Sequence, residues 1–169
     1  GALTWMSIEW IKTGKPTVIG IATGMVAGLA TITPASGTVG PQGALLIGFS
    51  AGLVCFYATQ IIKGYFKIDD SLDVFPVHGV GGILGILMLA FLGKPDGFLG
   101  IGSSGFEPSV WEQFIIQLQG VGVICLWTLI FSWVALRVTS LITPLRVDEQ
   151  SEDEGLDHTE HNETGYHAS

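Results

Sequence analysis

Long apolar stretches alternate with short polar breaks along most of this chain, and their lengths predict membrane-spanning helices. The stretch at residues 74–92 would extend about 28 Å as a helix, which matches the hydrocarbon core of a bilayer. Residues 112–143 would extend about 48 Å, so that helix must tilt, kink or project beyond the membrane. The five expected spans cover residues 1–11, 17–33, 44–62, 74–92 and 112–143. The pattern therefore predicts an all-α, polytopic membrane protein.

Composition supports the membrane class, because 48% of the residues are hydrophobic and only 13% are charged. A soluble domain carries about 25% charged residues. Small residues recur every four positions in two of the spans, which favours close contact between helices. They are Gly20, Gly24 and Gly28 in one span and Ala44, Gly48 and Gly52 in the next. The first span is expected to be the end of a helix that begins before Gly1, in a longer protein.

The net charge of −8 is concentrated at the C-terminus. Residues 144–169 hold eight acids and one base, Arg146, which gives −7; the other 143 residues hold seven acids and six bases, which gives −1. We therefore expect a transmembrane region over residues 1–143 and a solvated acidic tail over residues 144–169.

Basic residues on alternate sides of the spans orient the chain. One side holds Lys12, Lys15, Lys63, Lys67 and Arg146, whereas the loops on the other side hold only Lys94. The positive-inside rule then places the acidic tail in the cytosol and the loops 34–43 and 93–110 outside. The sequence has no basic stripe or nucleotide-binding loop, so nucleic acid is not an expected partner.

His78 is the only ionisable side chain between residues 74 and 92. An ionisable residue inside a span is a candidate functional site, because its burial in lipid is costly. Its small neighbours at helical spacing leave the surrounding face nearly bare: Val74, Gly81, Gly82 and Gly85. Such a face admits either a close helix or a narrow lumen, so His78 is either a packed histidine bonded to another helix or a pore histidine. A metal site is disfavoured, because the span has no second ligand on that face.

Two acidic residues precede this span and are candidates for capping its helix. Asp73 could be the N-cap, with Pro76 in the first turn, where proline is tolerated. Alternatively, Asp70 caps an earlier start and Pro76 kinks the helix. Both alternatives place an acid near the positive end of the helix dipole.

Other motifs carry no expected chemistry. Residues 48–52 match the G-x-S-x-G nucleophile elbow, but they lie inside an apolar span rather than at a strand–helix turn. His158, His161 and His167 lie in the polar tail, where a solvated, disordered segment is a better interpretation than a metal site. No metal or cofactor is therefore expected.

Several stretches, in order, resemble the ammonium transporter family (Amt/MEP/Rh). The resemblance is carried by Asp73-Val-Phe-x-Val-His-Gly-Val-Gly-Gly82, Trp5-x-x-x-Glu9-Trp10, Gly14-Lys-Pro16, Ala27-Gly-Leu-Ala-Thr-Ile-Thr-Pro-Ala35 and Leu145-Arg-Val147. In the tail it is carried by Glu154, Gly155, Leu156, Asp157, His161, Glu163 and Tyr166.

The resemblance implies an eleven-helix fold of two inverted halves, assembled as a homotrimer in the cell membrane. By resemblance, the chain covers the end of helix seven through helix eleven and the cytosolic tail. Each subunit of the family has a hydrophobic pore with two adjacent histidines, and His78 matches the second. Val74 matches a pore-lining position on the cytosolic side, and Thr33 is a weaker match near the outer half. The expected function is transport of ammonium or ammonia rather than an enzymatic reaction, and the alternative is an ammonium sensor of the same fold.

The tail resembles the family's regulatory segment. The resemblance implies that it orders against the cytosolic loops near Lys63 and Lys67 and helps to dock a PII-type regulator.

Overall fold

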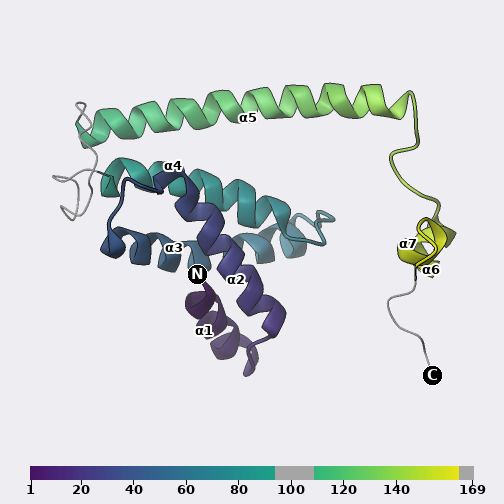
Figure 1. Cartoon of the computed structure of the whole chain (residues 1–169), viewed down its shortest axis with the longest axis horizontal. Coiled ribbons are helices and arrows are strands. Elements are labelled where there is room, and N and C mark those ends of the chain that lie inside the picture. The colour runs from purple at the N-terminus through teal and green to yellow at the C-terminus, as the bar shows by residue number, and fades with distance from the viewer. Residues whose placement is uncertain (94–108, 164–169) are drawn as a thin grey trace. The chain divides into compact units, whose positions relative to one another are not determined.

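The described residues of the computed structural model, 1–93 and 109–163, are helical and contain no β-strand, which confirms the all-α prediction (Figure 1). Within these residues, four helical stretches are long and apolar enough to cross a membrane: Val18–Ala35, Pro41–Tyr65, Phe75–Leu92 and Val110–Ser140. The chain divides into two compact units, Gly1–Gly122 and Val123–Ser169, which we describe separately.

The first unit opens with two helices joined by a tight turn, α1 (Ala2–Thr13) and α2 (Val18–Ile32). Gly14 ends α1 in the left-handed conformation with φ of 81°, which glycine adopts without a steric penalty. The Glu9 carboxylate accepts hydrogen bonds from the Thr17 amide at 2.8 Å and the Thr17 hydroxyl at 2.9 Å. The Glu9 side chain of α1 therefore binds Thr17, the N-cap residue of α2.

Close packing at small residues joins α1 to its neighbours. A Cβ atom at Gly24 would lie 2.5 Å from the Cβ of Trp5, and one at Gly52 would lie 2.6 Å from the Cβ of Thr4. Trp5 is buried and its ring meets the ring of Phe56 edge-on, with centroids 5.2 Å apart. The small residues expected to allow close helix contact do so at these positions.

Helix α3 (Pro41–Thr59) continues into a π-helical turn, η2 (Gln60–Tyr65). It begins three residues before the expected start at Ala44, because Pro41 occupies the first turn. Proline suits that position, since the first amides of a helix have no partner inside it. The sequence pattern places Pro41 instead in the loop expected over residues 34–43.

A second π-helical turn, η3 (Phe75–Val80), leads into α4 (Gly81–Leu92). One buried cluster packs Val77 of η3 with Trp5, Ala27, Cys55 and Phe56. A second cluster, around Ala35 of the short helix η1 (Thr33–Ala35), contains Ile47, Leu89 and Leu92. Together, these clusters fix η3 and α4 against α2 and α3.

Helix α5 (Val110–Ser140) is close to the span expected over residues 112–143. It begins two residues earlier than expected and ends three residues earlier. In the first unit, Trp111 and Phe114 of α5 lie beside Phe91 of α4, with ring centroids 6.0 and 5.3 Å from the Phe91 ring. The loop between these helices is expected over residues 93–110, but α5 already begins at Val110; residues 94–108 of this loop lie outside the described residues.

The second unit contains the rest of α5 and two short helices, α6 (Glu149–Glu154) and α7 (Leu156–Thr159). The acidic tail thus has local helical structure, so the expectation of a disordered segment is wrong over these two helices. Arg146 pairs with Glu152 at 2.8 Å, and Gly155 joins the two helices with φ of 96°. Glu154, Leu156, Asp157 and His161 lie in this segment, whereas Tyr166 lies outside the described residues.

Candidate functional site

The His78 side chain is exposed on the π-helical turn η3, just before α4. A π-helix closes its hydrogen bonds over five residues rather than four, and such turns are frequent at functional sites. Pro76 lies in the first positions of this turn, where its missing N–H leaves no bond unmade.

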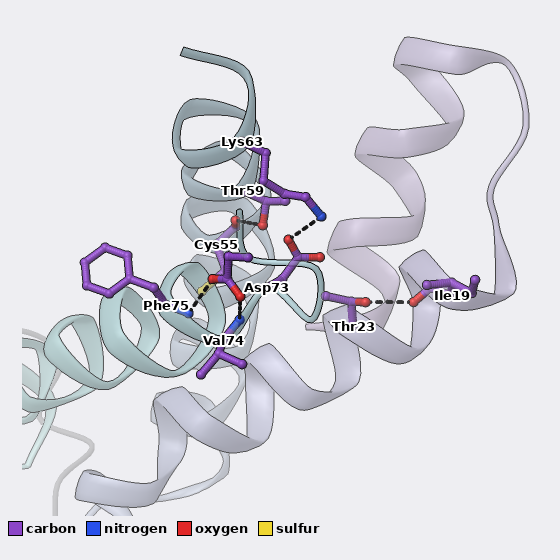
Figure 2. A network of polar contacts seen from close by, with 9 residues as sticks. Ile19, Thr23, Cys55, Thr59, Lys63, Asp73, Val74 and Phe75 are labelled. Carbon is purple, nitrogen blue, oxygen red and sulfur yellow. Dashed lines mark hydrogen bonds and ion pairs between the residues drawn. The ribbon is translucent and has the colours of Figure 1, made fainter. Parts of the chain in front are cut away.

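The Asp70 carboxylate caps the start of this helix. It accepts hydrogen bonds from the amides of Val74 at 2.9 Å and Phe75 at 2.8 Å, and Figure 2 shows these two residues beside the turn. Helical structure begins at Val74, directly after Asp73. The helix therefore begins where an N-cap at Asp73 would place its start, as the first alternative predicted. The side chain that caps it, however, is that of Asp70, as in the second alternative.

Asp73 has a different role from that of a side-chain cap. Its carboxylate pairs with the Lys63 ammonium at 3.0 Å, from η2 across the intervening loop (Figure 2). Its backbone has φ of 55°, in the left-handed region, and its carbonyl accepts the Val77 amide at 3.0 Å. Sequence reasoning missed this ion pair, because it used Lys63 only to orient the loops and as part of the loop expected to contact the tail. The opposite charges on either side of a short loop were the available signal.

The glycines near His78 divide between two environments. A Cβ atom at Gly81 would lie 2.8 Å from the Thr31 hydroxyl oxygen, and one at Gly85 would overlap the Thr31 carbonyl oxygen. Nothing lies within 4 Å of the same position at Gly82. Gly81 and Gly85 are thus close helix contacts to α2, whereas Gly82, like His78, is not covered by this chain.

The predicted pore-lining residues are both exposed in the chain. Val74 exposes 52% of its surface and lies one helical turn before His78. Thr33 lies in η1, and its hydroxyl donates to the Leu29 carbonyl at 2.7 Å. Since Ala35 of the same short helix packs on Leu89 and Leu92, Thr33 lies toward the other end of α4 from His78.

A buried polar group also lies beside this helix. The Thr31 hydroxyl is fully buried and has no hydrogen-bond partner among the described residues. The Cys55 sulfur lies near the same place, because a Cβ atom at Gly81 would be 3.2 Å from it. Sequence reasoning did not single out Thr31. Within residues 1–93 and 109–163, no group of three or more His, Cys, Asp or Glu side chains could hold a metal ion.

Residues 1–166 match the model of the Ammonium Transporter Family. The chain belongs to this family. An ammonium transporter from Aquifex aeolicus is 41% identical over 165 residues, which cover 98% of this chain and 38% of that protein. Among solved structures, Mep2 of Saccharomyces cerevisiae has 31% identity and a TM-score of 0.73, over 89% of this chain and 35% of that one. A structure titled "Sensor Amt Protein" has 27% identity and a TM-score of 0.80, over 94% and 38%.

Family membership confirms the resemblance and the helical transporter fold, and with the four candidate spans it identifies a membrane protein. The relatives are named transporters rather than enzymes. The chain spans about two fifths of the length of these ammonium transporter relatives. Its position within the family fold stays a prediction.

Proposed function

We propose that the full-length protein conducts ammonium or ammonia across the cell membrane, with His78 as a proton relay in a narrow apolar pore. The observation that carries this proposal is the division of one helix into two faces. Gly81 and Gly85 pack on Thr31, while His78 remains exposed in a span that has no other ionisable side chain. An exposed imidazole there is available to a solute.

The chemistry of the solute explains why a histidine would be needed. Ammonium is about the size of potassium, so a pore cannot separate them by size. An apolar lumen disfavours any ion, because the ion loses its hydration. Ammonium can release a proton and cross as ammonia, and potassium cannot. A neutral imidazole can hydrogen-bond ammonia and pass on a proton.

The chain supplies one side of such a pore. Val74 and His78 would line its inner part, and Thr33 would lie toward its outer part. The resemblance implies a second histidine in the rest of the protein, and the two would form a coupled relay. The same resemblance supports a homotrimer in the lipid bilayer with a cytosolic tail.

Regulation through the tail is a further part of the proposal. Glu154, Gly155, Leu156 and Asp157 form the junction of α6 and α7, and His161 follows it. An ordered acidic junction is suited to a basic surface on a PII-type regulator. Tyr166 would extend this segment.

An ammonium sensor is the second candidate, and the likeness to the structure titled "Sensor Amt Protein" favours it. The two functions differ in flux. A transporter moves ammonium when reconstituted alone, whereas a sensor binds it and conducts little.

The test is ammonium uptake or ammonium-evoked current in the reconstituted full-length protein, normalised to folded protein, with potassium as competitor. His78→Ala should lower the flux by about 10²-fold or more, since a positioned acid–base group contributes that much. Selectivity against potassium should also weaken. Cys55→Ala is the matched control, because it removes a buried group beside the same helix and retains the imidazole. Wild-type flux and selectivity in His78→Ala would refute the relay, and absent flux in the wild type would favour the sensor.

A further inference from the structure

The Lys63–Asp73 ion pair links the two π-helical turns found in the described part of the chain. Lys63 lies inside η2, and Asp73 lies two residues before η3 begins at Phe75. The Lys63 ammonium and the Asp73 carboxylate are 3.0 Å apart, and the Asp73 side chain is only 18% exposed. The pair therefore closes the loop that separates the end of the α3–η2 helix from the helix that carries His78.

Asp73 is connected directly to the turn that holds His78. Its carbonyl oxygen accepts the Val77 amide at 3.0 Å, one residue before His78. Its φ of 55° is a conformation that residues other than glycine rarely adopt. Such a conformation persists only where the surroundings hold it, and the Lys63 side chain is the group that holds Asp73 by its carboxylate.

The register of the turn decides where His78 faces. A π-helical turn holds one residue more than an α-helical turn, and one residue corresponds to about 100° of rotation. Gly81 and Gly85 are fixed against Thr31, so a change from π to α in η3 would rotate the preceding residues relative to α4. His78 would then leave the exposed face on which it now lies.

We propose that Lys63 and Asp73 are positioning residues for His78, which keep η3 in its π-helical register without contacting the solute. The proposal rests on the proposed function, because it names the groups that aim the relay. Asp70 holds the amides of Val74 and Phe75 at the start of the turn, whereas the Lys63–Asp73 pair sets the direction from which the chain enters it.

The experiment uses the full-length protein with Lys63→Glu, Asp73→Lys, and both changes together. Each single change places like charges opposite each other and should lower the maximal ammonium flux about fivefold, the size expected for loss of a partly exposed pair. The double change restores opposite charges and should recover most of the flux. Lys67→Glu is the matched control, because it makes the same charge change on an exposed lysine in the loop that follows η2. Asp73→Asn, which keeps the shape, serves if a charge reversal prevents folding.

Two further measurements separate this proposal from the proposed function. Hydrogen–deuterium exchange of residues 74–80 should rise in the single variants and return toward wild type in the double variant, and this readout is independent of transport. In a His78→Ala background, the Lys63 and Asp73 changes should have no further effect on flux. Failure of the charge swap to restore either flux or exchange would overturn the positioning role. Rescued exchange together with wild-type flux in His78→Ala would instead overturn the relay and leave the pair as a register device.

Discussion

At the scale of single residues, two glycines of α4, Gly82 and Gly85, differ in whether the packing requires a glycine. Gly85 lies against the backbone of α2, since a Cβ atom there would overlap the Thr31 carbonyl oxygen. The carbonyl belongs to a helix and cannot rotate away as a flexible side chain could. Gly82, three residues earlier, has nothing within 4 Å of its Cβ position.

Substitution by alanine should therefore have opposite effects at the two positions. Gly85→Ala should destabilise the full-length protein by about 1–3 kcal/mol, because the added methyl group overpacks a helix contact. Gly82→Ala adds the same methyl group on the face proposed to line the lumen, where this chain leaves space, and should be neutral or slightly stabilising, since alanine favours the helix. Thermal unfolding in detergent compares the two, and equal melting temperatures would show that α4 does not approach α2 this closely.

This division of the glycines could not be predicted from the sequence. The spacing from His78 showed a face of small residues, but a close helix and an open lumen require the same small side chains. The choice depends on Thr31, which is distant in sequence, and on the extra residue in η3. Thr31 itself gave no signal, because a threonine in an apolar span resembles any other small residue.

At the scale of elements, the acidic tail shows how a short helix begins. Asp148 precedes α6, and its carboxylate accepts hydrogen bonds from the Ser151 amide and the Ser151 hydroxyl, both at 2.9 Å. Both bonds favour the ionised carboxylate, so they lower the pKa of Asp148 below its ordinary value.

The pH dependence of α6 follows from this shift. A lowered pKa means that the cap stabilises α6 above the ordinary pKa of an aspartate, and that this contribution is lost as the pH falls through the lowered pKa. A carboxyl-carbon titration by nuclear magnetic resonance should give Asp148 a midpoint below the ordinary value for an aspartate. Ser151→Ala removes the hydroxyl donor and should raise the midpoint of Asp148. An ordinary midpoint for Asp148 in the unmodified protein would mean that the cap does not form.

Helix positions were more predictable than the connections between them. Hydropathy and length placed the apolar helices to within a few residues, because a long apolar segment has few alternatives to a buried or membrane-spanning helix. The two π-helical turns and the Lys63–Asp73 pair were not predicted. Both depend on how a loop brings residues together in space, and hydrophobic periodicity does not report that.

At the scale of the whole molecule, the chain spans less than half the length of its relatives and leaves much apolar surface exposed. The chain corresponds to 38% of its Aquifex relative, and most of its apolar helices expose large side chains. An exposed His78 is the state expected for one side of the proposed pore. The family could be recognised from motifs along the chain, whereas the proposed pore would include residues beyond this chain.

The orientation of the full-length protein in the membrane can be tested with single cysteines. Lys12, Lys15, Lys63, Lys67 and Arg146 are all expected on the cytosolic side, because positive loops are retained there. Ser36 is exposed in the loop after α2, and Asp153 is exposed in α6, so a cysteine at either position is accessible to a reagent on its own side. In a background with Cys55 and Cys125 replaced by alanine, Ser36→Cys should react with an impermeant maleimide added outside intact cells. Asp153→Cys should react only after the cells are opened, which also serves as its positive control. Labelling of Asp153→Cys in intact cells would reverse the topology and place the tail away from any cytosolic regulator.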